Sequence, residues 1–323
     1  MKRFFNAMIL LGLVLISCRT QSKVTVLKLA HALDITHPVH KGMVVMAEKV
    51  WEKSGGQMRV DIYPSGQLGN ERELIEMLQI GSLAMTKVST APLESFVPEM
   101  KIFGVPYLFR DDAHRWKVLN GEIGKQLLLA GQDYRVRGLC YYDAGCRSFY
   151  TKDVPINTPD DLGGLKIRVM KSITSMEMVK SLGGSATPIP WGELYTALQQ
   201  GVVDGAENNP PSFHLSRHYE VCKYYSLDEH TSVPDILLMS TAVWNRLTGQ
   251  EQKWLQAAVD ESVEAQKLYW KEAVDEALSV VQEAGVQIIH PDKGPFREKV
   301  RPMHESYKGT PIYTLIQAIE AIQ

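Results

Sequence analysis

The sequence predicts an α/β protein built as two units that a long helix braces. The first observation is an alternation over residues 24–88, in the order strand, helix, strand, helix, strand, which is typical of a parallel sheet covered on both faces. The second is a similar alternation that begins near Arg135. The third is the stretch 248–284, which has no proline and carries apolar residues at helical spacing. A helix of that length, about 50 Å at the usual rise, exceeds one small domain.

Length and composition agree with two globular domains. The chain has 323 residues, of which 45% are hydrophobic and 22% charged, and its formal net charge is −2. This allows two domains of ordinary size with a sizeable core. No dense basic run occurs, so neither nucleic acid nor an anionic membrane surface is expected as a partner.

Residues 1–18 are predicted to be an export signal. Lys2 and Arg3 precede an apolar run at 8–16, which is too short to span a bilayer as a mature helix. Residues 15–18, Leu-Ile-Ser-Cys, resemble a bacterial lipobox. That resemblance implies that Cys18 becomes the lipid-modified first residue of an exported, membrane-anchored protein. Plain secretion with an incidental cysteine is the alternative.

The remaining cysteines are Cys140, Cys146 and Cys222, an odd number that allows one disulfide at most. Cys140 and Cys146 fall in one extended stretch, which would hold them too far apart to bond. We therefore expect buried free thiols. No CxxC spacing points to a metal.

In the first unit, strands are expected at 24–30, 59–63 and 83–88, helices at 38–54 and 71–80, and a loop at 89–92. Asn70 precedes the second helix and can cap it. The inner side of the first helix is expected to carry the apolar residues at helical spacing, namely Met43, Val44, Met46, Ala47, Val50 and Trp51.

In the second unit, strands are expected at 139–150 and 165–169 and helices at 172–182 and 193–200, with 188–191 as an extended crossover. Residues 201–211 are expected to form a strand followed by a breaker-rich loop. A strand at 236–241 would return to the first unit. The inner side of the long helix is expected to include Leu255, Ala258, Val259, Val263, Leu268, Trp270, Val274, Leu278 and Val281.

Arg168 is the central candidate for binding. It lies on a strand in which apolar and polar residues alternate, and Ser172 can cap the helix that follows. A guanidinium on a rigid strand beside a helix start suits a small carboxylate. Its N–H groups can donate to both carboxylate oxygens at once, and helix amides add positive potential. The alternative is a surface arginine paired with an aspartate.

Three further residues are candidates in the second unit. Arg147 also follows a glycine in a strand-like segment; two converging arginines would need a shared anion, whereas an ion pair is the ordinary role of either. Asn208 stands at the end of a strand, where open α/β sheets bind ligands, or else serves turn geometry. Trp191 is a core aromatic or the floor of a pocket.

No phosphate loop, nucleophile elbow or HExxH motif is present. His31, His37 and His40 lie close in sequence, and three interpretations stay open: a metal site, a ligand contact or pH-sensitive loop, and ordinary loop histidines. An enzyme would need a general base near the arginines, for which His31, His37 or Glu207 would have to serve.

Motifs along nearly the whole chain resemble the periplasmic solute receptors of TRAP (tripartite ATP-independent periplasmic) transporters, in the branch named for dicarboxylate receptors. The segments that carry the resemblance are His31 with His37-Pro38, Y63-PSGQLG-69, G81-SL-83, F103-GVPY-107, G145-CR-147, G164-LKIRV-169, W191-GELYTALQ-199 and G201-VVDGAEN-208. Any one of them is weak, but eight in the correct order are highly specific.

The resemblance implies two α/β domains, braced by a long helix, that close on an organic anion. Arg168 then corresponds to the carboxylate-clamping arginine, Arg147 to a second arginine, Asn208 to an asparagine that completes the site and Trp191 to an aromatic residue. Ser89 and Thr90 fall in a loop with substrate-specific contacts, where sialic-acid receptors carry an acidic residue and an arginine, so sialic acid is not expected. Further candidates for hydroxyls or a second charge are Glu71 or Glu73, Lys87, Lys171, His230 and Asp235, with the His31/His37 loop.

We therefore expect a periplasmic receptor, not an enzyme and without a cofactor, that delivers a small organic acid to the small and large permease subunits. A sugar acid such as a uronate or aldonate is favoured, because the face opposite Arg168 is rich in hydroxyl and imidazole groups. The alternatives are a C4-dicarboxylate or 2-keto acid receptor, a sensor receptor of the same fold, and an exported enzyme acting on acidic sugars. The expected domains are 24–144 plus 234–270, and 145–233 plus 271–323.

Overall fold

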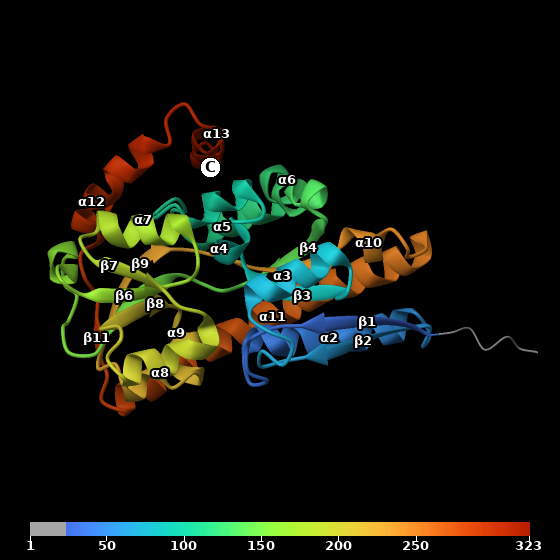
Figure 1. Ribbon diagram of the computed structural model, residues 1–323, viewed down its shortest axis with the longest axis horizontal. Coiled ribbons are helices and arrows are strands. Elements are labelled where there is room, and N and C mark those ends of the chain that lie inside the picture. Colours follow the sequence, from blue (N-terminus) through green and yellow to red (C-terminus); the bar gives the residue numbers. More distant parts are fainter. Residues whose placement is uncertain (1–23) are drawn as a thin grey trace, which may run out of the picture.

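The computed structural model describes residues 24–323, so the export signal and Cys18 lie outside the described residues. Two mixed sheets flanked by helices form the molecule (Figure 1). The first sheet has the strand order β2-β1-β3-β10-β4 and the second the order β11-β9-β5-β8-β6-β7. The α/β class and the long bracing helix are confirmed.

The first sheet begins as predicted and then departs from a parallel arrangement. β1 (Thr25–Ala30) runs parallel to β2 (Met58–Tyr63) and β3 (Met85–Ser89). The helices between them are α2 (Pro38–Lys53) and α3 (Glu71–Ile80). β10 (Asp235–Ser240) then pairs antiparallel with both β3 and β4 (Val136–Tyr142). β4 thus runs in the same direction as β1, β2 and β3, and β10 alone makes the sheet mixed.

The alternation predicts that the second unit begins near Arg135, but residues 136–142 belong to the first sheet. The stretch 139–150 forms two strands rather than one: β4 belongs to the first sheet and β5 (Arg147–Thr151) to the second. The chain crosses at 143–146, where Gly145 has a φ of +57°. A Cβ there would lie 3.2 Å from the Trp270 ring, so a larger residue at this crossing would be strained.

The second sheet holds the strands that carry the candidate arginines. β5 lies between β8 (Gly205–Asn208) and β9 (Tyr224–Thr231), antiparallel to both. β6 (Lys166–Val169) lies between β8 and β7 (Ser185–Pro188), parallel to both. α7 (Ile173–Ser181) and α8 (Leu194–Gln199) connect these strands. β9 leads through residues 232–234 back to β10, so the chain crosses between the sheets a second time.

Two predicted loops are short helices. Residues 89–92 contribute to α4 (Thr90–Leu93), and Pro210 and Pro211 open α9 (Pro210–Leu215). The Asn209 side chain accepts a hydrogen bond from the Ser212 amide at the start of α9. Proline is favourable at the first helical positions because no hydrogen bond is required of its nitrogen there, so the proline pair that suggested a breaker begins a helix instead.

α11 (Gly249–Glu283) holds 35 residues and packs against α2 and β4 of the first unit and α9 of the second. In Figure 1 it runs in orange from one unit to the other. Leu268 is 66% exposed and Trp51 of α2 is 50% exposed, contrary to their predicted inward positions. The Trp51 ring lies over the turn at Gly56. The buried residues of α11 do not include Leu268.

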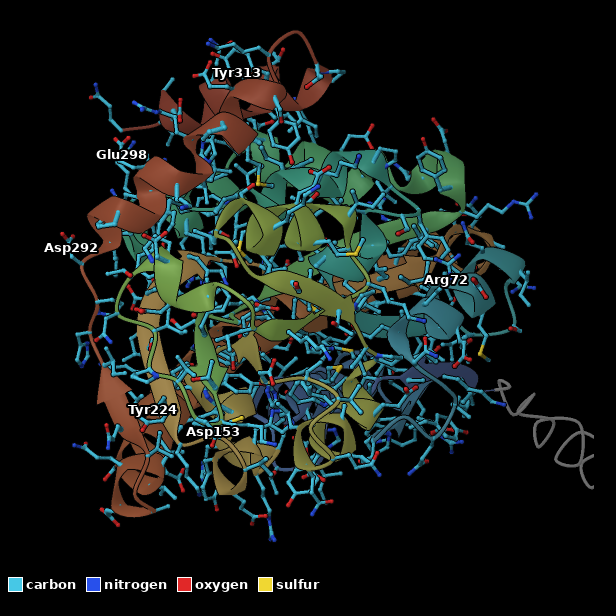
Figure 2. The ribbon with its side chains drawn as sticks, turned by 60° about the vertical axis from the view of Figure 1, so that its left-hand side comes forward. Arg72, Asp153, Tyr224, Asp292, Glu298 and Tyr313 are labelled. Carbon is cyan, nitrogen blue, oxygen red and sulfur yellow. The ribbon has the colours of Figure 1, made fainter. Side chains whose placement is uncertain are left out.

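The remaining elements complete both units. They are α5 (Asp112–Asn120), α6 (Glu122–Ala130), α10 (Thr241–Trp244), β11 (Gln287–Ile289), α12 (Lys293–Ser306), α13 (Pro311–Glu320) and the 3₁₀ turns η1 (Pro98–Gly104), η2 (Gln132–Tyr134), η3 (Pro159–Leu162), η4 (Trp191–Glu193) and η5 (His218–Glu220). α12 and α13 follow the outside of the molecule, marked by Glu298 and Tyr313 in Figure 2.

The C-terminal helix contacts the first unit. α13 packs against η1, and His114 of α5 hydrogen-bonds the Ile319 carbonyl at 3.0 Å. The chain thus ends on the first unit, while the division that places 271–323 in the second unit stays a prediction. One hydrophobic core is also continuous across the units, since it includes Phe103 of η1 and Ile167 of β6.

The start of α11 yields a stability prediction. Thr248 Oγ1 accepts from the Glu251 amide at 3.2 Å, and a Glu251 carboxylate oxygen accepts from the Thr248 amide at 2.8 Å. We expect Thr248→Ala to lower the free energy of unfolding by about 1 kcal/mol, because a helix amide loses its cap. Urea unfolding measures the change. Thr314→Ala on an exposed position of α13 is the control, and equal stability of both variants would contradict the prediction.

Candidate functional site

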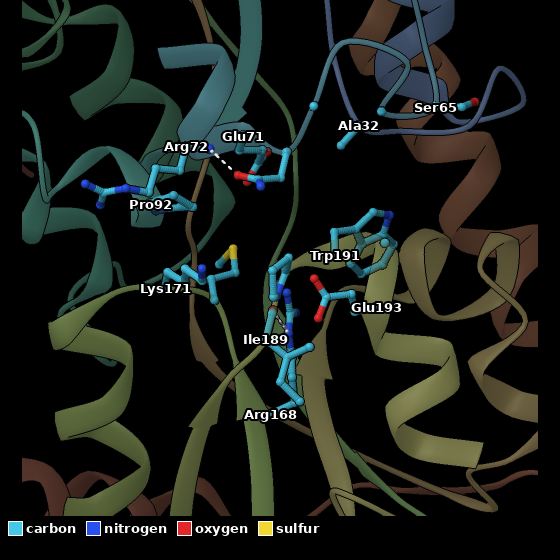
Figure 3. Close-up of a pocket in the computed structure, with 16 residues that line it drawn as sticks. Ala32, Ser65, Glu71, Arg72, Pro92, Arg168, Lys171, Ile189, Trp191 and Glu193 are labelled. Carbon is cyan, nitrogen blue, oxygen red and sulfur yellow. Dashed lines mark hydrogen bonds between the residues drawn. The ribbon is translucent and has the colours of Figure 1, made fainter. Parts of the chain in front are cut away.

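Two adjoining cavities lie where the units face each other. The outer one encloses about 270 Å³ and the inner one about 50 Å³. Both are lined by Ala32, Glu71, Arg168, Met170 and Trp191, so together they form one space, called the cleft below. Figure 3 shows Arg168, Ile189 and Trp191 on the second unit facing Glu71 and Pro92 on the first.

Arg168 carries a buried positive charge toward this cleft. Its strand β6 lies inside the sheet next to the edge strand β7, with Arg168 paired to Thr187 of β7 and Ala206 of β8. The residue is 2% exposed; its Nε donates to the Ile189 carbonyl at 2.9 Å, and its guanidinium lies 5.9 Å from the Trp191 ring centroid. Its Nη1 is buried without a hydrogen-bond partner among residues 24–323.

The environment of Arg168 favours an incoming anion. Burial lowers the pKa of its guanidinium, and the opposing influence of Tyr150 and Glu207 does not offset it. A buried cation that lacks a paired carboxylate is costly. A ligand carboxylate would satisfy both the charge and the unpaired nitrogen, because two of its oxygens match the guanidinium fork.

Arg147 is in a different state, although it also lines the inner cavity. Its Nε pairs with Glu207 Oε2, and its Nη2 donates to Glu207 Oε1 at 3.0 Å and to the Glu207 carbonyl at 2.7 Å. Burial would lower the pKa of Arg147, but Glu207 outweighs it and raises that pKa. The charge of Arg147 is therefore already compensated within the protein.

Asn208 is oriented by this pair. Its Oδ1 accepts from Arg147 Nη1 at 2.8 Å and from the Asn209 amide at 2.9 Å, while Tyr225 donates to its carbonyl at 2.8 Å. Because the oxygen is engaged twice, the amide nitrogen of Asn208 is the group left to donate into the inner cavity. Arg147 thus positions a neutral donor beside Arg168.

A charged network supports Arg147 from behind. His230 Nδ1 lies 2.8 Å from Asp228 Oδ2, and its Nε2 lies 3.6 Å from Glu207 Oε2. Burial would lower the pKa of His230, but Asp228 and Glu207 raise it to about 9. Burial would raise the pKa of Glu207, but Arg147 and His230 lower it to about 2. His230 itself lines neither cavity of the cleft.

The first unit presents acidic groups on its wall of the cleft. Lys87 Nζ lies 3.0 Å from Asp235 Oδ2 and 3.6 Å from Glu71 Oε1. Glu71 opens α3, which Asn70 caps as predicted, and its Oε1 accepts from the Ser89 amide at 2.9 Å. Burial raises the pKa of Glu71 and of Asp235, against the opposing effect of Lys87.

The other predicted site residues are dispersed. Lys171 lines the outer cavity, and Ser89 lines the inner one with its Oγ buried and unpaired within the described chain. Thr90 donates to the Pro234 carbonyl at 3.1 Å and lines neither cavity. His31 is also outside them; its Nε2 lies 2.9 Å from His40 Nδ1, and burial, with Lys87 and His40, lowers its pKa to about 3.

The cleft lining includes His37 of the predicted His31/His37 loop and two residues, Ser212 and Glu193, that residue patterns missed. His37 Nε2 lies 3.4 Å from Ser212 Oγ across the two units. Burial lowers the pKa of His37 well below its ordinary value, so its imidazole is neutral. The motif around His37 gave one signal for it; nothing local marked Ser212, because its role depends on how the units meet.

Within residues 24–323 no group of three or more His, Cys, Asp or Glu side chains could hold a metal ion. No helix in this part of the chain combines the length and apolarity needed to cross a membrane. Cys140, Cys146 and Cys222 are free thiols, with Cys146 half-buried rather than buried.

Two sheets joined by crossing strands, with a buried arginine between them, define a solute-binding protein. The chain belongs to the family described as bacterial extracellular solute-binding protein, family 7 (DctP), whose model matches residues 29–310. This is a family of solute-binding receptors rather than enzymes, and solved structures similar to this chain are periplasmic solute-binding proteins of TRAP transporters.

Among the relatives, YiiZ of Salmonella typhimurium, itself uncharacterized, is 40% identical and the match covers 92% of this chain and 91% of YiiZ. A TRAP periplasmic solute-binding protein from Xanthobacter autotrophicus, solved with bound β-D-galacturonate, is 36% identical with a TM-score of 0.89 over 92% of this chain and 100% of that chain. One from Polaromonas, bound to D-erythronate, is 33% identical with a TM-score of 0.90, covering 93% and 99%.

The His230 network yields a pH prediction. The pKa of His230 is about 9 in the folded protein against an ordinary 6.5, so its stabilisation is complete below the ordinary value and is lost as pH rises through about 9. We expect the free energy of unfolding to fall between pH 7 and 9.5, with a slope approaching about 1.4 kcal/mol per pH unit from this group.

Urea unfolding across that pH range measures the slope. His230→Gln should remove this part of it, whereas His290→Gln at an exposed position should keep it. Parallel pH profiles for the wild type and His230→Gln would show that His230 does not gain a proton on folding.

Proposed function

We propose that this protein is the extracytoplasmic receptor of a TRAP transporter for a sugar acid with one carboxylate, a hexuronate in the first place. The observation that carries the proposal is Arg168, buried in the cleft with an unpaired Nη1. Arg168 would bind the ligand carboxylate with two parallel hydrogen bonds, and the amide nitrogen of Asn208 would add a third. Trp191 would cover one side of the ligand.

The charges along the cleft favour one carboxylate over two. Arg147 is compensated by Glu207, and Lys87 faces the two carboxylates of Glu71 and Asp235. Arg168 is thus the single deeply buried cation of the cleft, within the described residues, without a carboxylate partner. A second buried carboxylate would call for a second buried cation. Lys171, which also lines the cleft, is exposed, so the predicted dicarboxylate alternative has less support. Hydroxyl groups suit the opposing acidic wall.

Proteins similar to this chain support the same ligand class. Solved relatives hold galacturonate, glucuronate and erythronate, all monocarboxylates that carry hydroxyls. A relative from Rhodobacter capsulatus, 29% identical, is a C4-dicarboxylate-binding protein, so the family includes the alternative as well. The charge arrangement around Arg168 is the reason to group this chain with the receptors of hydroxylated monocarboxylates.

Ligand capture would use the two chain crossings as hinges. Residues 143–146 and 232–234 connect the sheets, and a few residues at the ends of elements are sufficient to absorb domain closure. The closed receptor would then deliver its ligand to the small and large permease subunits. The division into domains 24–144 plus 234–270 and 145–233 plus 271–323 remains a proposal, modified by the contact of α13 with the first unit.

An exported enzyme has no comparable support. The bases considered for it are engaged or remote: Glu207 is paired with Arg147, the Nδ1 of His37 accepts from the Val39 amide, and His31 lies outside the cavities. None of the three bases considered for an enzyme is therefore available to act beside Arg168.

The ligand and its clamp are tested on the soluble form, residues 19–323, with galacturonate, glucuronate, erythronate and C4-dicarboxylates. A ligand at a hundred times its dissociation constant stabilises by about 2.7 kcal/mol, which a thermal melt resolves. We expect a shift with uronates. Arg168→Ala should weaken their binding at least about 100-fold, because two hydrogen bonds to a charged group, each worth roughly 1.5–3 kcal/mol, are lost.

Arg59→Ala is the control, since Arg59 is an exposed partner of Asp61. If Arg168→Ala folds and retains the full shift, Arg168 is not the clamp. A shift with C4-dicarboxylates in place of uronates would favour the dicarboxylate alternative. No shift with any acid would favour a sensor receptor or another cargo.

We further propose that Cys18 carries lipids that anchor the protein in a membrane facing the periplasm, on the basis of the Leu-Ile-Ser-Cys sequence after the apolar run. Expression in a Gram-negative host with radiolabelled palmitate should label the wild type, and Cys18→Ala should abolish labelling and prevent anchoring. Cys222→Ala is the control. Equal labelling of Cys18→Ala and the wild type would exclude this anchor.

A further inference from the structure

We infer that Glu71, Lys87 and Asp235, called the wall triad here, set the specificity of the receptor: they bind a hydroxyl group of the ligand and exclude a second carboxylate. This inference rests on the proposed function and deepens it. It assigns to the first unit the discrimination between a uronate and the corresponding six-carbon dicarboxylate, an open-chain aldarate with a carboxylate in place of the C1 aldehyde.

The wall triad is assembled from three elements of the first unit. Glu71 is the first residue of α3, Lys87 lies in the middle of β3, and Asp235 opens β10. Asp235 pairs with Ser89 in the register of these strands, and Leu237 pairs with Lys87. Asp235 and Lys87 therefore lie on the same face of the sheet. The side chains of Lys87, Asp235 and Glu71 are 3%, 10% and 18% exposed, and all three line the inner cavity.

Two carboxylates share one ammonium group in this arrangement. Lys87 Nζ lies 3.0 Å from Asp235 and 3.6 Å from Glu71. Lys87 acts on the imidazoles of His31 and His37, which are neutral because burial and the Lys87 charge lower their pKa. With both acids ionised, the wall triad itself therefore carries a net charge of about −1.

Other charges near the wall triad come from the second unit. Arg168 of β6 acts on Glu71, and Arg147 of β5 acts on Asp235. Arg147 is held by Glu207, and Arg168 would be occupied by the first ligand carboxylate. A second carboxylate at the far end of the ligand would therefore meet like charge in a desolvated site, a juxtaposition that costs several kcal/mol in general.

The wall triad has the hydrogen-bonding capacity for a hydroxyl. Glu71 Oε1 is engaged by Ser89 and Lys87, and Asp235 Oδ2 by Lys87, so each acid keeps a second oxygen as an acceptor. Lys87 has three N–H donors, and Ser89 Oγ is buried nearby without a partner in the described structure. A hydroxyl can both donate to a carboxylate and accept from the ammonium, whereas an ionised carboxylate can only accept.

The test compares galacturonate with galactarate by isothermal titration of the soluble form at pH 7.5. The wild type should bind galacturonate at least about 100-fold more tightly, because like charge opposes the aldarate. Glu71→Gln and Asp235→Asn each keep shape and remove one negative charge. Each should reduce this ratio at least about tenfold, since the repulsion is partly relieved. Glu76→Gln, an exposed acid of α3 paired with Arg72, should leave it unchanged.

The outcomes separate the inference from the proposed function. A wild type that binds galactarate as tightly as galacturonate overturns the inference without any variant. So does an unchanged ratio in both triad variants, which urea unfolding first shows to be folded. In either case uronate binding sustains the proposed function. If the wild type binds neither compound nor any other hydroxylated monocarboxylate, the proposed function itself fails.

Discussion

The ion pair between Arg147 and Glu207 determines the electrostatics of the cleft. Two arginines from strands of one sheet, β5 and β6, reach the same cavity, and two uncompensated guanidiniums so placed would repel each other. Glu207 neutralises the charge of Arg147. Arg147 and His230 in turn keep the Glu207 carboxylate ionised. What remains for the ligand is the Arg168 guanidinium and the Asn208 amide, which Arg147 orients.

The position of this site follows from the chain path. β4 and β10 contribute to the first sheet, while β5 and β9 next to them in sequence lie in the second, so the ligand-facing ends of both sheets meet at the crossings. α11 packs on elements of both units and ties them together. The cleft is therefore a consequence of the same connections that would allow closure. Its two walls come from different sheets, so they can differ in charge.

Those two walls have complementary roles. The second unit offers a cation and an amide donor, which suit a carboxylate. The first unit offers two carboxylates around one ammonium and a serine hydroxyl, which suit hydroxyl groups. A hydroxylated monocarboxylate matches both, and the ligands of similar solved receptors have this composition. Because both walls are buried, a ligand group that does not match would leave a buried polar group of the protein without a hydrogen-bond partner. This penalty is a stronger basis for selectivity than contact area.

The sequence by itself determined the α/β class, the capped helix α3 and the long helix α11, because these depend on local periodicity and capping residues. It also marked Arg168, whose strand and following cap are continuous in the chain, and the ordered motifs identified the family. It did not reveal that residues 139–150 divide between two sheets, that Pro210 begins a helix, or that Trp51 and Leu268 face outward. Only the tertiary structure decided which arginine is uncompensated, because Glu207 lies sixty positions from Arg147. It likewise joined Glu71, Lys87 and Asp235, since long-range strand pairing, and not sequence proximity, brings their charges within a few ångströms.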